Sequence, residues 1–243
     1  MQVAIRSFAP RSDDFEVVEH KGTGHPDTIC DGIAEASGVA LARYYLARFG
    51  AILHFNVDKA LLVGGESRPA FGGGDVLQPM QAILAGRATC DVRGVRVPVH
   101  DIVTAAAKDW VRAHLHALDP ESQMTWDCRV RAGSAELVDL FLASAKTGGG
   151  WFANDTSIGA GYAPASDLER AVAAASRRLR DMTREHPEVG EDIKIMGVRH
   201  AGRAELIVCC ALIGRYVQDA SDYAARRAEI GRASCRERVW IPV

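Results

Sequence analysis

Polar side chains crowd residues 19–32, EHKGTGHPDTICDG, just before an apolar run with helical spacing. Pro26 biases His25 toward an extended conformation, and Asp27 or Thr28 is predicted to cap the helix. His25 would then lie beside free helix N–H groups, which attract anions. This arrangement suits a phosphate, with His25 donating to a phosphoryl oxygen and Asp27 holding Mg²⁺ nearby. The alternative is that Asp27 only caps the helix and that His25 is a surface residue.

Two glycine-rich segments are further candidates for binding chemistry. Residues 63–75, VGGESRPAFGGGD, supply flexible backbone N–H groups and two carboxylates, but they lack the lysine and the Ser or Thr of a P-loop. An exposed hairpin whose glycines take positive φ angles explains this segment nearly as well. Residues 153–164, ANDTSIGAGYAP, contain the oxygen-bearing Asn154, Asp155 and Thr156, which suit a hard cation or a ribose. Ordinary turn chemistry is the alternative there.

A fourth segment, residues 190–197, has the sequence GEDIKIMG. Asp192 and Lys194 share one face of a predicted strand, because side chains two residues apart point the same way. The other face carries Ile193 and Ile195. Asp192 and Lys194 therefore form either an ordinary surface ion pair or one wall of a charged site.

A mixture of strands and helices must position these side chains. Hydrophobic periodicity predicts helices over about 28–50, 99–118, 134–143 and 166–185, and strands over 3–5, 15–18, 52–57, 60–63, 124–130, 192–198 and 204–212. The strands at 52–57 and 60–63 are predicted to form a hairpin around Asp58 and Lys59, and residues 64–79 are predicted to be irregular. Because hairpins and helices do not alternate strictly, an α+β fold with antiparallel sheets is favoured over a doubly wound parallel one.

Composition narrows the class of protein. The 243 residues are 48% hydrophobic and 25% charged with a formal net charge of −2, which is typical of a globular protein and predicts no nucleic-acid partner. The start of the chain lacks the pattern of a signal segment, and the longest apolar run, Leu206 to Gly214, is too short to span a membrane. We therefore expect a soluble, cytoplasmic protein without a membrane partner. The six cysteines form no Cys-x-x-Cys pair, which favours reduced thiols.

In their linear order, these segments resemble the archaeal-type methionine adenosyltransferases, the S-adenosylmethionine synthetases. The likeness runs from about residue 15 to about residue 225 and is carried by GTGHPDTICDGIAE, NVDKALLVGGES, FGGGDVLQP, GRAT, DCRVRAGSAELVDLF, ANDTSIGAGYAP and VGEDIKIMG. The resemblance implies an α+β fold of intertwined subdomains, with antiparallel or mixed sheets and helices on one face. It also implies ATP:L-methionine S-adenosyltransferase activity, Mg²⁺ and K⁺ as cofactors, and a homodimer with active sites between its subunits.

The same resemblance implies roles for individual residues. His25 would contact the triphosphate and assist its departure, while Asp192 and Lys194 would lie near adenosine and phosphate as further catalytic residues. ATP and methionine would be bound by Asn154, Asp155, Thr156 and Ser134. Cations would be bound by Asp27, Asp155, Asn56 and Asp58. Ala132 stands where the family has a glutamine near the methionine site, so the methionine contacts depart from the family pattern.

The end of the chain differs from the family. Members of the family continue well beyond the last predicted strand, and residues 229–243, EIGRASCRERVWIPV, resemble a translated adapter rather than any family segment. We therefore expect residues 1–228 to be the N-terminal portion of the fold, with an incomplete third subdomain, followed by a non-native tail. Such a chain is expected to be inactive alone. The alternatives are an inactive nucleotide-binding fragment and a Mg²⁺-dependent phosphohydrolase that uses Asp27 and Asp155 without methionine.

Overall fold

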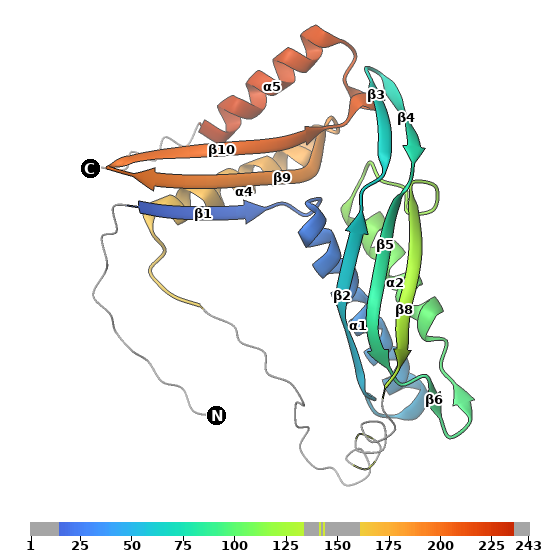
Figure 1. Ribbon diagram of the computed structural model, residues 1–243. Helices are drawn as coiled ribbons and strands as arrows, with labels where there is room; N and C mark the ends of the chain where they lie inside the picture. Colours follow the sequence, from blue (N-terminus) through green and yellow to red (C-terminus); the bar gives the residue numbers. More distant parts are fainter. Residues whose placement is uncertain (1–14, 134–140, 142, 144–160, 236–243) are drawn as a thin grey trace.

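The computed structural model describes residues 15–133, 141, 143 and 161–235. Within them the chain forms two three-stranded sheets, and helices pack against one face of each sheet (Figure 1). One sheet has only antiparallel pairs, and the other also contains a parallel pair. The predicted α+β class, with antiparallel and mixed sheets and helices on one face, is therefore confirmed.

The first sheet joins a strand from the beginning of the described chain to two strands near its end. Its order is β1-β9-β10, so the chain leaves this sheet after β1, builds the second sheet and then returns. This path intertwines the two units. The elements of the unit are β1 (Phe15–Lys21), α4 (Asp167–Glu185), β9 (Val189–His200), β10 (Arg203–Leu212), the 3-10 turn η1 (Gly214–Tyr216) and α5 (Ala220–Cys235).

Alternation along β9 separates the two faces of the first sheet. Ile193 and Ile195 are buried in a core shared with the apolar residues of α4, whereas Asp192 is exposed and Lys194 is partly exposed. Because successive side chains of a strand point to opposite faces, Asp192 and Lys194 lie on the face away from α4. The predicted separation of the two side-chain pairs is thus confirmed.

Helix α4 begins where the sequence predicts it. The Ser166 side chain accepts a hydrogen bond from the Glu169 backbone N–H at 3.0 Å, and the Glu169 carboxylate accepts one from the Ser166 N–H at 2.6 Å. This reciprocal capping box satisfies two N–H groups at the helix start. At the other end of the unit, α5 runs through Glu229 to Cys235, so the predicted domain boundary at residue 228 lies inside a helix.

The second sheet has the order β2-β5-β8. β2 and β5 are antiparallel, whereas β5 and β8 are parallel and are joined by a crossover that contains α2. Its elements are α1 (Pro26–Phe49), β2 (Phe55–Val63), β5 (Met80–Ala88), α2 (Val99–His114) and β8 (Met124–Ala132). A shared core of fully buried side chains joins the sheet to its helices and includes Ile33, Leu41, Tyr45, Leu84 and Val103.

The predicted hairpin around Asp58 and Lys59 is wrong. β2 is one continuous strand in which the pairing with β5 shifts between Asn56 and Lys59, as a β-bulge does. Gly86 on β5 permits this bulge, since a Cβ atom at Gly86 would lie 2.0 Å from the Asn56 carbonyl oxygen. Asp-Lys also lacks the Gly or Asn that a two-residue hairpin turn requires.

Residues 64–79, predicted to be irregular, instead contain a complete exposed hairpin of β3 (Glu66–Ala70) and β4 (Gly73–Gln78). Gly72 sits at its tip with φ of +71°, a conformation that favours glycine. The Gly72 N–H donates to the carbonyl oxygens of Gly214 (3.0 Å) and Val217 (2.7 Å), which ties the hairpin to the first unit. The hairpin alternative is therefore confirmed.

Other elements differ from the prediction by a few residues. Helix α2 ends at His114 rather than near residue 118, and the short strands β6 (Asp91–Val92) and β7 (Val95–Arg96) form a small hairpin. The predicted strand at 3–5 and most of the predicted helix at 134–143 lie outside the described residues. In the described part of the chain, no helix combines the length and the apolar composition needed to cross a membrane.

Candidate functional site at the start of helix α1

A glycine turn fastens the start of α1 to the first half of β9. The Gly22 N–H donates to the Ile193 carbonyl at 2.6 Å, and the Gly24 N–H donates to the Glu191 carbonyl at 2.9 Å. A Cβ atom at Gly22 would lie 2.7 Å from the Glu191 oxygen, and one at Gly24 would lie 2.6 Å from the Asp192 nitrogen. Only glycine permits this close approach of two backbones. The turn thereby brings the helix start beside the strand that carries Asp192 and Lys194.

His25 is the residue that caps α1, which corrects the prediction that Asp27 or Thr28 does so. Its backbone is extended, with φ of −67° and ψ of 139°, and its Nδ1 accepts a hydrogen bond from the Asp27 N–H at 3.2 Å. An imidazole whose Nδ1 accepts carries its proton on Nε2 when neutral. Nε2–H therefore remains available as a donor, on a side chain that is 17% exposed.

Asp27 and Lys194 are linked through Glu19 and Lys21, two residues that the sequence motifs did not indicate. Lys21 Nζ lies 2.5 Å from Asp27 Oδ2 and 3.7 Å from Glu19 Oε2, and Lys194 Nζ lies 2.6 Å from Glu19 Oε1. The hydrogen bond from Lys21 lowers the pKa of Asp27, and the one from Lys194 lowers the pKa of Glu19. Both carboxylates are thus held in their charged form.

The pairing of β1 with β9 explains how this charged cluster of Glu19, Lys21, Asp27 and Lys194 assembles. Lys21 lies directly opposite Lys194, and Glu19 lies opposite Met196 on the same face of the sheet. The Glu19 carboxylate offsets the two ammonium groups, which would otherwise repel each other. The alternation of Glu19 and Lys21 in the sequence EHK was the available signal, but the predicted strand ended at residue 18 and so excluded it.

Asn56 and Asp58, the other described candidates for cation binding, lie far from this cluster. Helix α1 runs antiparallel to β2, so Leu62 lies by Cys30 near the helix start and Phe55 packs on Tyr45 near the helix end (Figure 1). At about 1.5 Å per residue, the start and end of α1 are roughly 35 Å apart. Within one chain, the structure does not bring Asn56 and Asp58 to His25 and Asp27.

The bulge in β2 does bring Asn56 and Asp58 to each other. In the amide orientation that satisfies both groups, the Asn56 side-chain nitrogen donates to Asp58 Oδ1 at 2.5 Å. Lys59 Nζ donates to Asp58 Oδ2 at 2.8 Å. The Asp58 carboxylate is therefore already balanced by a cation.

The remaining predicted site residues, Ser134, Asn154, Asp155 and Thr156, lie outside the described residues. Ala132, at the position where the family glutamine was expected, is the last residue of β8, and its carbonyl accepts a hydrogen bond from Arg87 at 3.0 Å. Among residues 15–133, 141, 143 and 161–235, no three His, Cys, Asp or Glu side chains gather in a geometry that would hold a metal ion. A cation at α1 would thus rely on one or two carboxylates together with ligands from its substrate.

Comparison with known proteins agrees with this combination of segments. A model of the S-adenosylmethionine synthetase (AdoMet synthetase) family matches residues 3–237. A probable S-adenosylmethionine synthase of Aquifex aeolicus is 45% identical over 233 residues, which cover 95% of this chain and 58% of the relative. The S-adenosylmethionine synthase of Aeropyrum pernix is 47% identical over 237 residues, covering 94% of this chain and 58% of the relative.

A third relative, the S-adenosylmethionine synthase of Pyrobaculum calidifontis, is 47% identical over 224 residues, which cover 90% of this chain and 55% of that protein. The chain thus spans little more than half the length of these relatives. The family model nevertheless matches nearly every residue of the chain, including all the described candidate site residues. The chain therefore belongs to the S-adenosylmethionine synthetase family.

Proposed function

We propose that the whole protein is an ATP:L-methionine S-adenosyltransferase, which forms S-adenosylmethionine and releases pyrophosphate and phosphate. Membership of the family supports this activity. The structural observation that supports it most directly is the glycine turn, whose two hydrogen bonds to β9 gather His25, Asp27 and Lys194 at one helix start. Free N–H groups, a histidine donor and an ammonium group together suit a triphosphate.

The proposed reaction needs alignment and charge compensation rather than a general base. The methionine sulfur attacks C5′ of ATP, the S–C5′ bond forms, and the C5′–O bond breaks as the triphosphate leaves with the electron pair. His25 Nε2–H donates to an oxygen of the leaving triphosphate, and Lys194 compensates the charge that develops on it. Asp192, on the same strand face, contacts the adenosine side. Water then cleaves the triphosphate to pyrophosphate and phosphate.

Asp27 is the described residue best suited to hold Mg²⁺. Its side chain is 63% exposed at the mouth of α1, and its pKa is lowered by the hydrogen bond from Lys21, so a charged carboxylate oxygen faces the proposed triphosphate position. Bound Mg²⁺ would neutralise phosphate charge. Because Mg²⁺ keeps several waters and often binds proteins through one or two carboxylates, a single described aspartate is compatible with it. Lys21, released from Asp27, would then be free to contact the phosphates.

Other contacts of the proposed reaction involve residues elsewhere in the chain. Ser134, Asn154 and Thr156 are proposed to contact ATP or methionine, and Asp155 to contact substrate and metal. Asn56 and Asp58 are proposed to bind a second cation such as K⁺, which would replace the Lys59 ammonium at the bulge. Their distance from His25 within one chain is consistent with sites that combine residues of two subunits.

A cytoplasmic homodimer is the proposed state of the whole protein. The face of the first sheet that carries Glu19 and Lys21 also exposes Phe15 (59%), Val17 (50%) and Ile207 (47%). Large apolar side chains on a strand face that no described helix covers are typical of an interface between copies. A second copy on this face would also enclose the charged cluster.

The test is to incubate the protein with ATP, L-methionine, Mg²⁺ and K⁺ and to follow S-adenosylmethionine by mass spectrometry. The chain is assayed alone and joined to the C-terminal segment of the Aeropyrum pernix relative. His25→Ala should reduce turnover by about 10²–10³-fold, the usual effect of losing one pre-organised donor. Arg177→Ala, at an exposed residue of α4 outside the cluster and away from the proposed interface, should leave it unchanged.

Each outcome distinguishes one function from another. Methionine-dependent product that His25→Ala abolishes supports the proposal. Phosphate release from ATP without methionine would favour a phosphohydrolase that uses Asp27 and Asp155. ATP binding without any turnover in either form would favour an inactive nucleotide-binding protein and would contradict the proposed transfer.

A further inference from the structure

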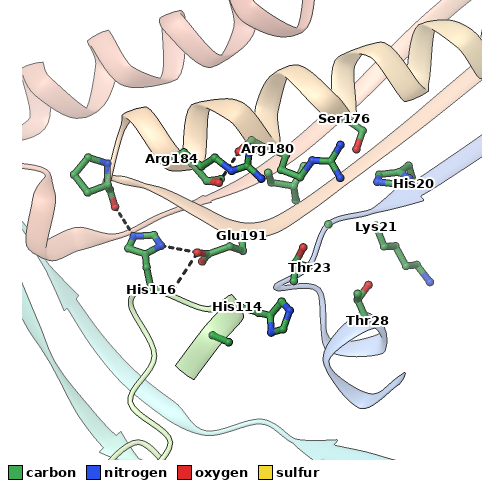
Figure 2. A pocket seen from close by; sticks show the side chains of 15 residues that line it. His20, Lys21, Thr23, Thr28, His114, His116, Ser176, Arg180, Arg184 and Glu191 are labelled. Atoms are coloured by element: carbon green, nitrogen blue, oxygen red, sulfur yellow. Dashed lines mark hydrogen bonds and ion pairs between the residues drawn. The ribbon is translucent and has the colours of Figure 1, made fainter. Parts of the chain in front are cut away.

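A cavity of about 730 Å³ lies between the glycine turn and α4, and Lys21 of the charged cluster is one of its lining residues (Figure 2). Its walls come from β1, the glycine turn, the start of α1 at Thr28, the end of α2, α4 and the start of β9. Polar side chains on these walls include His20, Thr23, Ser176, Arg180, Arg184 and Glu191. Its volume lies in the range typical of small-molecule sites. Of the described residues assigned above to adenosyl transfer, only Lys21 lines this cavity.

The cavity has an excess of positive charge. Glu191 is the one carboxylate among the lining residues that the structure describes, and His116 Nδ1 lies 2.6 Å from its Oε1. Arg184 has only the exposed Asp181 nearby, at 3.6 Å, and Arg180 has no ion-pair partner among the described residues. Arg180 and Arg184 lie one helical turn apart on α4 and border the cavity (Figure 2), and the one carboxylate paired with them in the described residues, Asp181, does not line it.

His20 and Arg180 line the same cavity, and the two side chains affect each other electrostatically. Burial and then the charge of Arg180 lower the pKa of His20, which disfavours its protonation at neutral pH. The other charged or titratable groups that line the space are Lys21, His114, His116, Arg184 and Glu191, of which Lys21 is paired with Asp27. An anion between Arg180 and His20 would offset the guanidinium charge and favour protonation of His20.

We propose that this cavity binds a small phosphorylated anion of the size of inorganic pyrophosphate, held by Arg180 and Arg184. Arginine matches phosphate oxygens with pairs of N–H donors, and it stays charged at every physiological pH. The hydroxyl groups of Thr23 and Ser176 line the same space and supply further donors. Because Thr23 belongs to the glycine turn that positions His25, an anion bound in this cavity contacts that turn from the side of α4.

The experiment titrates the protein with inorganic pyrophosphate, orthophosphate and ATP, and follows the His20 imidazole signal by NMR and the binding heat by calorimetry. His20→Gln identifies the signal among the eight histidines. We expect saturable binding of pyrophosphate and an upward shift of the His20 pKa. Arg180→Gln with Arg184→Gln should weaken binding at least tenfold. Arg177→Gln with Arg178→Gln removes the same charge from exposed residues of α4 that do not line the cavity, and should have little effect.

Two further variants separate this cavity from the proposed triphosphate position. His25→Ala and Lys194→Ala should leave pyrophosphate binding and the His20 shift intact, even where they abolish adenosyl transfer. If ATP also shifts the His20 signal and competes with pyrophosphate, the ligand is the phosphate chain of a nucleotide. If only pyrophosphate shifts the signal, the ligand is a free phosphate. The proposal is overturned if no anion shifts the His20 signal saturably, if the two arginine pairs have equal effects, or if His25→Ala removes the binding.

Discussion

The contact between His116 and Glu191 predicts a stability that falls as the pH rises. His116 follows α2 in the second unit, and Glu191 belongs to β9 in the first. His116 Nδ1 lies 2.6 Å from Glu191 Oε1 and Nε2 lies 2.8 Å from the Pro187 carbonyl oxygen. Both neighbours accept hydrogen bonds, so both ring nitrogens must donate, which requires the protonated imidazolium. The ring also stacks on Tyr216, at 6.1 Å between centroids.

The sign of the effect follows from the pKa of His116. Burial opposes protonation, but the hydrogen bonds to Glu191 and Pro187 outweigh it and raise the pKa. The nearby Arg215 acts in the opposite direction without reversing the shift. A raised folded-state pKa means that the stabilisation is complete below the unfolded value of about 6.5 and is lost as the pH rises through the folded value.

The magnitude follows from the two hydrogen bonds. A hydrogen bond to a charged group contributes about 1.5–3 kcal/mol when buried. The His116 side chain is 30% exposed, so we expect the pair together to contribute about 2 kcal/mol rather than the full sum. For a chain of this size that corresponds to a change in Tm of about 4–8 °C.

The assay is urea unfolding of the parent protein, His116→Gln, Glu191→Gln and the control His200→Gln at about pH 6 and about pH 8.5, which bracket the titration of histidine. Between the lower and the higher pH, we expect the free energy of unfolding of the parent and of His200→Gln to fall by about 2 kcal/mol more than that of His116→Gln. The free energy of unfolding of Glu191→Gln should fall less with pH than that of the parent, because a neutral amide no longer favours the imidazolium. If His116→Gln shows the same pH dependence as the parent, the imidazolium contact is not the source of the effect.

Three further predictions rest on packing and burial. Gly24→Ala places a Cβ atom 2.6 Å from the Asp192 nitrogen, so it should cost about 1–3 kcal/mol by urea unfolding and weaken ATP binding, whereas Gly64→Ala, in open space, should not weaken binding. Gly32→Ala places a Cβ atom 2.2 Å from the Trp110 ring, so it should destabilise the chain although alanine favours helices. Adding Trp110→Leu should partly restore the stability. A Gly32→Ala variant that is more stable than the parent would contradict this packing. Burial raises the pKa of the Cys210 thiol to about 11, so at pH 8 a disulfide reagent should modify the exposed Cys209 before Cys210, and Cys209→Ser should slow the labelling of the peptide that contains both residues while Cys210→Ser should not.

Features that depend on a few neighbouring residues could be predicted from the sequence. Ser166 caps α4 because its partner is only three residues away, and Gly50 ends α1 because a left-handed residue, with φ of +74°, closes the helix within one turn. The alternation of Ile193 and Ile195 with polar neighbours predicted the two faces of β9. Each of these signals is local, so no knowledge of distant segments was needed.

Features that depend on a distant partner could not be predicted in the same way. Whether the chain turns at Asp58 or continues through a bulge is decided by β5, where Gly86 leaves room for the Asn56 carbonyl. The cap of α1 is His25 rather than the predicted Asp27 or Thr28, because backbone hydrogen bonds to β9 hold the turn before the helix. Local propensity alone gave no means of choosing between these alternatives.

The same division applies to the candidate site. Residue type and spacing in the sequence identified His25, Asp27 and Lys194 as charged or donor groups beside a helix start and a strand. Only the tertiary structure joined them, because the register of β1 on β9 sets Lys21 opposite Lys194 and so makes Glu19 and Lys21 part of the cluster. A side chain's chemistry belongs to its own residue, whereas its charge partners and its distance from another group depend on how separate segments pack.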